Sequence, residues 1–204
     1  MTGQSVVSSR PTTRAGGRWR TVDIVVASAI AAVFGIVFFA WNNLWSVLDV
    51  AVPAKALIYG VWVMAGVVGA LVIRKPGAAV YTEFLAGLFS ALVAVSWSGA
   101  SIIVYGLIQG LAAELVFALF RWKGWNLAVA VAAGAVAGLA AAVLDLFVYR
   151  YYPGFSAGWQ VGYLAVVVLS GAVVAGLLSW LLVRALAATG VLDPFASGRD
   201  RRRI

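Results

Sequence analysis

The segment GLIQGLAAELVFALF, residues 106–120, is apolar apart from Gln109 and Glu114. With the residues before it from position 100, it reaches about 20 mostly apolar residues, the length that crosses the hydrocarbon core of a bilayer. Arg121 and Lys123 follow directly and would end such a span at the membrane surface. The segment therefore predicts a transmembrane helix that carries an amide and a carboxyl at membrane depth.

The composition of the whole chain is that of an integral membrane protein. Of 204 residues, 64% are hydrophobic and 11% are charged, and the mean hydropathy is +1.01. A water-soluble globule could not bury so much apolar surface. The chain has no cysteine and no histidine, which removes disulfides, thiol nucleophiles and imidazole chemistry. We therefore predict no metal site and no cofactor. We also predict no nucleic-acid partner, because the basic residues lie at the ends of apolar segments and act as topology signals.

Six segments are apolar and long enough to span a membrane: 22–41, 55–73, 77–97, 100–120, 125–149 and 159–186. Turn-forming or charged stretches separate them, such as Arg74-Lys75-Pro76-Gly77 and Tyr152-Pro153-Gly154. The expected fold is all-α, with a six-helix membrane domain at 21–187. Basic tails are expected on either side of it, at 1–20 and 188–204.

The basic residues predict the orientation of these spans. Only Lys55 and Arg150 fall on one side, whereas the other side takes Arg10, Arg14, Arg18, Arg20, Arg74, Lys75, Arg121, Lys123, Arg184, Arg199, Arg201, Arg202 and Arg203. Because cytoplasmic loops collect lysine and arginine, both termini are expected in the cytoplasm. The chain has no G-x-x-x-x-G-K-[ST] phosphate loop, so any ATP hydrolysis would belong to another subunit.

Three acidic residues, Glu83, Glu114 and Asp145, fall at membrane depth within the predicted spans. An ionisable group at membrane depth costs about 2.5 to 3.5 kcal/mol on insertion scales, which makes each a candidate for function. At a rise of 1.5 Å per residue, Glu83 and Glu114 both lie about 9 Å from the cytoplasmic ends of their spans. The two carboxyls could then share a proton or a bound cation. Alternatively, each is hydrogen-bonded inside the bundle and serves only packing.

Polar and aromatic side chains gather in the outer half of the predicted bundle. Tyr105 and Gln109 are four residues apart and share a helix face, with Ser101 one turn higher. This polar face indicates a cavity. An aromatic and amide cluster lies at the same level, comprising Trp41, Asn42, Trp45 and Trp97. These residues form either an interfacial aromatic belt or stacking walls for a flat ring.

The first span carries small residues four apart, Ala27-x-x-x-Ala31-x-x-x-Gly35. Such spacing leaves a groove through which another helix can approach closely. The fifth span has a similar pattern, Gly134-x-x-x-Gly138-x-x-x-Ala142, so the spacing alone does not tell which helix meets a partner.

These features together resemble the substrate-binding S component of an energy-coupling factor vitamin transporter. Three segments are similar to S components of the YkoE type, which are assigned to thiamine or its hydroxymethylpyrimidine precursor: RWRTVDIVVASAIAAVFGIVFFAWN (18–42), KPGAAVYTEF (75–84) and GLIQGLAAELVFALFRWKGW (106–125). The resemblance implies a binding protein of the bacterial cytoplasmic membrane, itself no enzyme. It would work with a transmembrane coupling subunit and cytoplasmic ATPases.

The resemblance also implies roles for particular residues. Ala27 and Ala31 match the alanine motif that faces the coupling subunit in S components, and Gly35 continues it. Substrate would lie in the outer half, and the predicted contacts, with the two deeper glutamates included, are Trp41, Asn42, Trp45, Trp97, Tyr105, Gln109, Asp145, Glu83 and Glu114. The absence of histidine means that no imidazole contact can be carried over.

Other functions are compatible with the sequence. The chain could be an S component for a different small vitamin, or a non-catalytic assembly or regulatory subunit whose polar residues only hold the bundle together. An intramembrane enzyme is disfavoured, because its three candidate acids lie on three helices and at two depths. A small molecule that co-purifies with the protein would favour the S component, and activity without partner proteins would favour the enzyme.

Overall fold

The computed structural model describes residues 18–47, 52–93 and 99–199, and all regular structure in these ranges is helical. This confirms the predicted all-α class. The elements in chain order are α1 (Thr21–Val47), α2 (Val52–Ala56), η1 (Tyr59–Val63), α3 (Met64–Ile73), α4 (Ala78–Val93), α5 (Gly99–Leu119), α6 (Leu127–Val143), η2 (Leu144–Val148), α7 (Ala157–Ser170), η3 (Gly171–Leu178), α8 (Ser179–Ala188) and α9 (Ala196–Arg199).

Local sequence explains where several of these helices begin and end. Asn126 caps α6, because its side chain accepts a hydrogen bond from the backbone N–H of Val129 at 3.0 Å. Ser156 caps α7 in the same way through Trp159. After α3, Arg74 adopts a left-handed conformation with φ 55° and donates its N–H to Ala70, which is a common way for a helix to stop. Gly77, with φ 84°, then allows the tight turn into α4.

Five helical stretches are long and apolar enough to cross a membrane: Thr21–Val47, Ala54–Ile73, Ala100–Leu119, Leu127–Val148 and Ala157–Ala188. The second, fourth and fifth are not regular α-helices throughout, since they contain the 3₁₀ segment η1 and the π-helical segments η2 and η3. The remaining predicted span, 77–97, corresponds to α4, which is apolar but shorter, and residues 94–98 lie outside the described ranges. Six crossings therefore stay a prediction.

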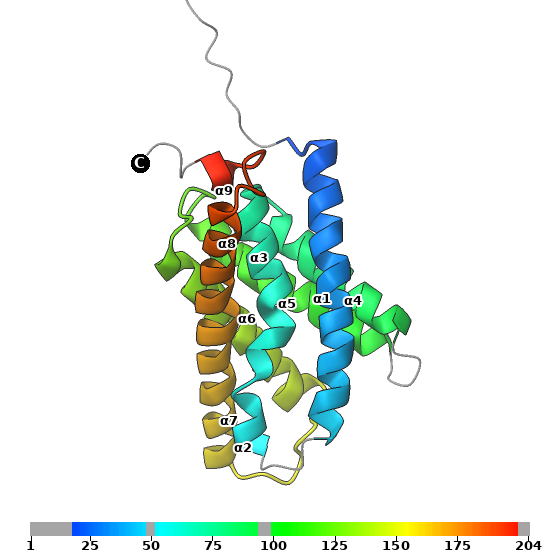
Figure 1. Cartoon of the computed structure of the whole chain (residues 1–204). Coiled ribbons are helices and arrows are strands. Elements are labelled where there is room, and N and C mark those ends of the chain that lie inside the picture. Colours follow the sequence, from blue (N-terminus) through cyan, green and yellow to red (C-terminus); the bar gives the residue numbers. More distant parts are fainter. Residues whose placement is uncertain (1–17, 48–51, 94–98, 200–204) are drawn as a thin grey trace, which may run out of the picture.

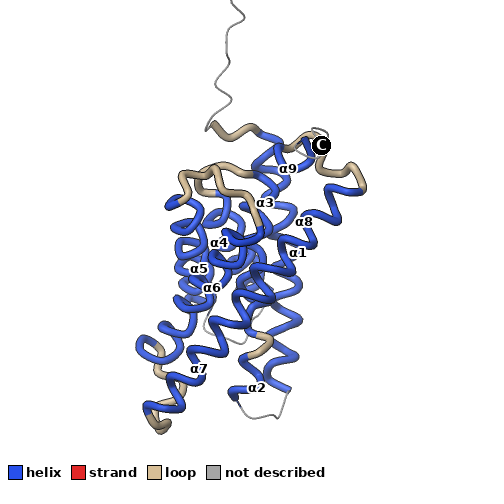
Figure 2. The backbone as a smooth tube through the Cα atoms, turned by 90° about the vertical axis from the view of Figure 1, so that its left-hand side faces the viewer, coloured by secondary structure: helices blue, strands red, loops and turns tan. Residues whose placement is uncertain are grey.

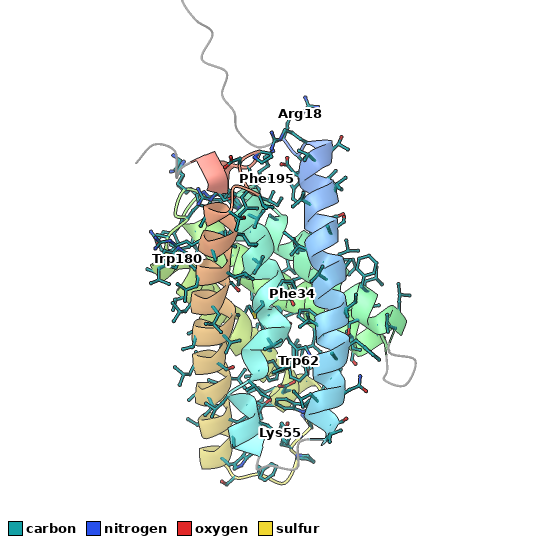
Figure 3. All side chains as sticks on the ribbon, viewed as in Figure 1. Arg18, Phe34, Lys55, Trp62, Trp180 and Phe195 are labelled. Atoms are coloured by element: carbon teal, nitrogen blue, oxygen red, sulfur yellow. The ribbon has the colours of Figure 1, made fainter. Side chains whose placement is uncertain are left out.

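The helices form one bundle (Figure 1), and its loops lie mostly at the two ends (Figure 2). Both ends of the described chain lie at the same end of the bundle, here termed the terminal end, which carries Arg18 and Phe195 (Figure 3). The opposite end, termed the far end, carries Lys55 of α2. This arrangement agrees with the expectation that both termini share one side. Which side of the membrane that is stays a prediction from the charges.

Helix α3 forms the centre of the bundle, and every residue from Ala65 to Ile73 is buried. It packs against α1, α4 and α8, while α6 packs against η3 and α5. Helix α6 and η3 approach each other closely, since a Cβ placed on Gly171 would lie 2.3 Å from the carbonyl oxygen of Gly134. The small-residue pattern of the fifth span is thus used inside the chain, because only glycine lets the two backbones approach this closely.

The segments predicted to be tails are partly folded. At the start of α1, the buried Asp23 forms ion pairs with Arg20 and with Lys75 of the α3–α4 turn, and the indole of Trp19 donates to Pro76. At the other terminus, the chain after α8 turns back over the bundle and buries Leu192 and Phe195. The first residues after α8 therefore pack against the bundle, in one apolar cluster with α3, while the basic tail at 188–204 stays a prediction.

Candidate functional site

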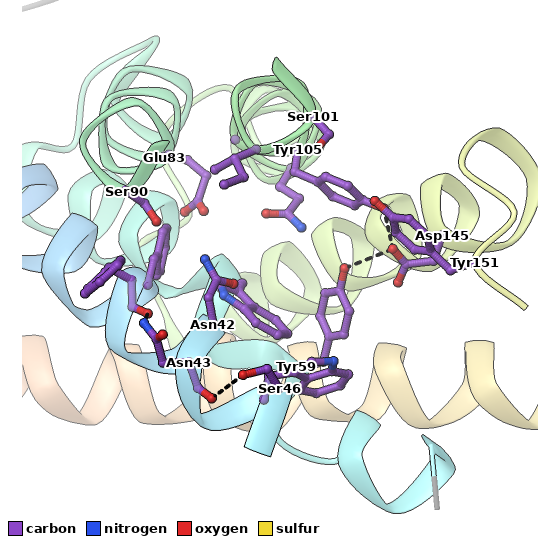
Figure 4. A pocket seen from close by; sticks show the side chains of 18 of the residues that line it. Asn42, Asn43, Ser46, Tyr59, Glu83, Ser90, Ser101, Tyr105, Asp145 and Tyr151 are labelled. Atoms are coloured by element: carbon purple, nitrogen blue, oxygen red, sulfur yellow. Dashed lines mark hydrogen bonds between the residues drawn. The ribbon is translucent and has the colours of Figure 1, made fainter. Parts of the chain in front are cut away.

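A cavity of about 450 Å³ lies in the half of the bundle toward the far end. Its walls come from the last turns of α1, from η1, from α4, from the first half of α5, from η2 and from the segment that leads into α7. The volume falls within the range of small-molecule sites, roughly 300 to 1,000 Å³. Figure 4 shows the polar side chains that point into it.

Asp145 is the centre of a hydrogen-bonded cluster on one side of the cavity. Its carboxylate accepts hydrogen bonds from three phenols: Tyr163 at 2.6 Å, Tyr59 at 3.4 Å and Tyr105. Asp145 is 3% exposed, and a carboxyl so deeply buried is tolerated only where donors surround it. The cluster depends on η2, because this π-helical stretch at the end of α6 sets the direction in which Asp145 projects.

Glu83 and Ser90, both on α4, form a second polar group in the cavity. One carboxyl oxygen of Glu83 accepts the backbone N–H of Gly66 at 2.5 Å. The other oxygen of Glu83 and the hydroxyl of Ser90 are buried and have no hydrogen-bond partner among the described residues. Such groups are costly to bury and indicate a missing partner.

The side-chain amide of Gln109 projects from α5 into the same part of the cavity. Gln109 is 2% exposed, and no hydrogen bond joins its amide to another residue in the described ranges. The cavity thus holds three buried polar side chains, from two neighbouring helices, with unused hydrogen-bonding capacity.

Aromatic rings line the side of the cavity near the far end. Trp45, Tyr59 and Trp62 contact one another edge to face, with centroids 4.8 to 6.0 Å apart. Across the cavity, Tyr151 stacks on Tyr149, which stacks in turn on Tyr105. Burial raises the pKa of Tyr151, so this phenol stays a protonated donor at neutral pH. The cavity therefore offers flat apolar faces next to hydrogen-bonding groups.

Most of the residues predicted to contact substrate meet in this cavity. Those that line it are Asn42, Trp45, Glu83, Tyr105, Gln109 and Asp145. Trp41 does not line it, because its indole turns toward η1 and donates to the carbonyl of Ile58 at 3.2 Å. Trp97 lies outside the described residues.

Glu114 is placed differently from the prediction. Its carboxylate accepts the backbone N–H groups of Gly77 at 2.7 Å and Ala79 at 2.9 Å, and the indole N–H of Trp122 at 2.7 Å. These contacts hold it at the N-terminus of α4, outside the cavity, where unpaired N–H groups and the helix dipole favour a negative charge. The proposed sharing of a proton with Glu83 is not what the structure shows, since Glu83 points to Gly66 instead.

The small residues of α1 pack inside the chain, and their contact with a coupling subunit stays a prediction. Ala27 and Ala31 are completely buried, and a Cβ on Gly35 would meet Phe89 at 2.5 Å and the carbonyl of Ala86 at 3.2 Å. At Gly35, α4 of the same chain fills the groove. The spacing predicted a close helix contact, but spacing alone could not tell an internal neighbour from an external one.

Among the cavity residues that were not predicted from the sequence are Tyr59, Trp62, Ser90 and Tyr163. Tyr59 and Trp62 lie three apart in an otherwise aliphatic span, which was a weak signal of a lined face. Ser90 and Tyr163 gave no such signal, because single hydroxyl-bearing residues are common as packing contacts between membrane helices.

The known proteins similar to this chain are all permease or S-component subunits of transporters. Residues 22–140, more than half of the chain, match the model of a family described as the permease component of an ABC-type cobalt transport system. The YkoE protein of Bacillus subtilis (strain 168), provisionally named an HMP/thiamine permease protein, is 38% identical over 187 residues, covering 91% of this chain and 93% of its own length.

A solved structure gives the same answer for the fold. The crystal structure of an S component of an ECF transporter superposes with a TM-score of 0.86 at 38% identity, over 91% of this chain and 94% of the other. The resemblance that the sequence motifs indicated is thereby confirmed. The chain belongs to the family of S components of energy-coupling factor transporters, multi-pass subunits of the cytoplasmic membrane that bind substrate and are not themselves enzymes.

Proposed function

We propose that the chain binds thiamine or its hydroxymethylpyrimidine precursor in the cavity near the far end. It would take up the ligand from outside the cell and deliver it together with a coupling subunit and cytoplasmic ATPases. The name of the Bacillus subtilis relative supports this ligand class, as does the chemistry of the cavity.

The observation that carries the proposal is the set of buried polar groups with unused hydrogen-bonding capacity beside aromatic faces. An aminopyrimidine is a flat ring with a hydrogen-bond donor and acceptors along its edge. The free oxygen of Glu83 can accept from the amino group, and the amide of Gln109 can donate to a ring nitrogen. A ligand that satisfies both groups removes the cost of leaving them unpaired, about 1 to 3 kcal/mol each.

The second ring of thiamine, which is positively charged, also finds complementary groups. Trp45, Tyr59 and Trp62 offer aromatic faces to a cation, an interaction of roughly 0.5 to 2 kcal/mol depending on solvent exposure. Asp145, as the acceptor of three phenol hydrogen bonds, places negative charge beside them. Hydroxymethylpyrimidine lacks this ring and would leave that part of the cavity unused, so we expect thiamine to bind more tightly.

The test is a titration of the purified protein with thiamine and with hydroxymethylpyrimidine. Binding is followed by the fluorescence of its nine tryptophans or by calorimetry. Glu83→Gln and Gln109→Ala should each weaken binding about tenfold or more, because each leaves a polar group of the ligand without its partner. Glu114→Gln is the matched control, since it makes the same change outside the cavity and should leave the affinity unaltered.

Two results would overturn this proposal. If neither compound binds the folded protein, the ligand is neither thiamine nor hydroxymethylpyrimidine, and other small vitamins become the candidates. Equal loss of affinity in Glu83→Gln and Glu114→Gln would show that the cavity does not hold the ligand as described.

A further inference from the structure

The ionisable side chains that line the cavity carry carboxyl or phenol groups and no basic group. Glu83 and Asp145 are both almost completely buried there, and the described residues of the wall include no lysine and no arginine. The other polar groups of this wall are neutral amides, hydroxyls and indoles. An anion that enters the cavity therefore leaves water without gaining a positively charged partner, and the desolvation of an unpaired charge is costly.

The tyrosines around Asp145 do not offset that cost, because their protons are already used. Tyr59, Tyr105 and Tyr163 each direct their hydroxyl to the Asp145 carboxylate, and Figure 4 shows the contact of Tyr59. A phenol has a single O–H to donate. A phosphate next to this cluster would meet a carboxylate and three phenol oxygens that have no further proton to give.

The proposed binding mode brings the hydroxyethyl group of thiamine to this side of the cavity. The charged ring is assigned to the aromatic faces of Trp45, Tyr59 and Trp62. Tyr59 is also one of the three donors to Asp145. The hydroxyethyl group is attached to that ring, and it is the group that carries the phosphate in thiamine phosphates. Phosphorylation thus adds negative charge on the side where Asp145 lies.

We propose that the cavity accepts free thiamine and excludes its phosphate esters, and that Asp145 determines this selection. The inference rests on the proposed function. A phosphate monoester carries about 1.5 to 2 negative charges at neutral pH, and their repulsion by the carboxylate adds to the cost of desolvation. Where the vitamin occurs as an ester, hydrolysis must come before capture: water cleaves the P–O bond and releases the free alcohol and inorganic phosphate.

Lys55 is a basic side chain close to the aromatic side of the cavity, and its effect must be separated from that of Asp145. Its ammonium lies 5.0 Å from the ring centre of Trp45. Lys55 is not itself part of the wall, so we expect it to contribute little to the binding of a phosphate. Lys55→Gln should therefore leave the preference for free thiamine close to that of the wild type.

The test compares the affinities of the purified full-length protein for thiamine and for thiamine monophosphate, measured by calorimetry. Thiamine monophosphate should bind about thirtyfold more weakly or worse, because repulsion is not compensated by a cation. Asp145→Asn should narrow the ratio of the two dissociation constants about fivefold, since it removes the charge and keeps one acceptor oxygen. The ratio is the readout because a general loss of folded protein affects both ligands alike.

Two further variants complete the comparison. Glu114→Gln is the matched control, because it alters a carboxyl group outside the cavity and should leave the ratio unchanged. Ser46→Lys adds a cation to an exposed position of the wall without touching the Asp145 cluster. It should narrow the ratio even if Asp145→Asn does not fold.

Equal affinity of the wild-type protein for the two compounds would overturn the proposal. A ratio that Asp145→Asn and Glu114→Gln change to the same extent would contradict the role of Asp145. A ratio that widens sharply in Lys55→Gln would show that Lys55 binds the phosphate, against the proposal. Absence of thiamine binding would contradict the proposed function itself, so the two failures are distinguishable.

Discussion

The three acids Asp145, Glu83 and Glu114 are each matched by donors from other parts of the chain. Asp145 receives three phenols, Glu83 receives one backbone N–H and keeps one oxygen for the cavity, and Glu114 receives two backbone N–H groups and an indole. Position separates their roles, because Asp145 and Glu83 line the cavity whereas the hydrogen bonds of Glu114 hold it at the N-terminus of α4.

Glu114→Ala is therefore expected to affect stability and not ligand binding. The change leaves the part-buried N–H groups of Gly77, Ala79 and Trp122 without their acceptor, which costs less than the about 1 to 3 kcal/mol of a fully buried unpaired donor but acts at three places. Thermal unfolding in detergent should show a clearly lower midpoint, with a smaller decrease for Glu114→Gln, which keeps one acceptor oxygen. A variant with normal stability but weakened thiamine binding would contradict this assignment.

At the scale of elements, irregular helix segments create the site. The 3₁₀ segment η1 directs Tyr59 and Trp62 into the cavity, and the π-helical η2 directs Asp145 toward the same point. The longest irregular segment, η3, instead serves packing, since Gly171 and Gly176 allow α6 to approach closely. The breaks in regular helix thus coincide with the places where side chains or backbones must meet.

Substitution at this helix contact tests its importance. A Cβ on Gly171 would lie 2.3 Å from the carbonyl oxygen of Gly134 and must push α6 away from η3. Gly171→Ala should lower the unfolding temperature by several degrees. Gly162→Ala on α7 is the control, because no atom lies within 4 Å of its new Cβ, and alanine is about 1 kcal/mol better than glycine inside a helix. Similar midpoints for the two variants would rule out a tight α6–η3 contact.

At the scale of the whole molecule, the ends of the bundle differ in charge and in function. The far end holds the cavity, whereas the terminal end holds the ion pairs of Asp23 with Arg20 and Lys75. The excess of lysine and arginine at the terminal end predicts that this end faces the cytoplasm. The cavity would then open toward the outside, as capture of an external vitamin requires.

This orientation can be measured directly, because the chain has no cysteine of its own. Gly154→Cys places a thiol in the loop before α7 at the far end, where a side chain would meet nothing within 4 Å. Lys123→Cys places one at the terminal end, between α5 and α6. In intact cells a membrane-impermeant maleimide should label only Gly154→Cys, and Lys123→Cys should react after permeabilisation. The reverse pattern would show that the predicted orientation is wrong.

The sequence predicted the fold class and much of the site for a simple reason. In hydrocarbon the backbone must satisfy its own hydrogen bonds, so long apolar segments predict helices, and polar residues inside them are too costly to be incidental. Asn42, Trp45, Tyr105, Gln109, Glu83 and Asp145 were recognisable in this way. Tyr59, Trp62, Ser90 and Tyr163 were not, because their positions depend on η1 and on helix contacts that no local pattern encodes.

The sequence by itself thus determined an all-helical membrane protein, the family to which it belongs, and a polar face on the fourth predicted span. Only the tertiary structure decided which neighbours each residue has. It buried Ala27 and Ala31 inside the bundle, placed Glu114 at the N-terminus of α4, and left one oxygen of Glu83 unpaired in the cavity. Residue type and spacing specify what a helix face can do, but the partner that meets that face is set by the packing of helices far apart in the chain.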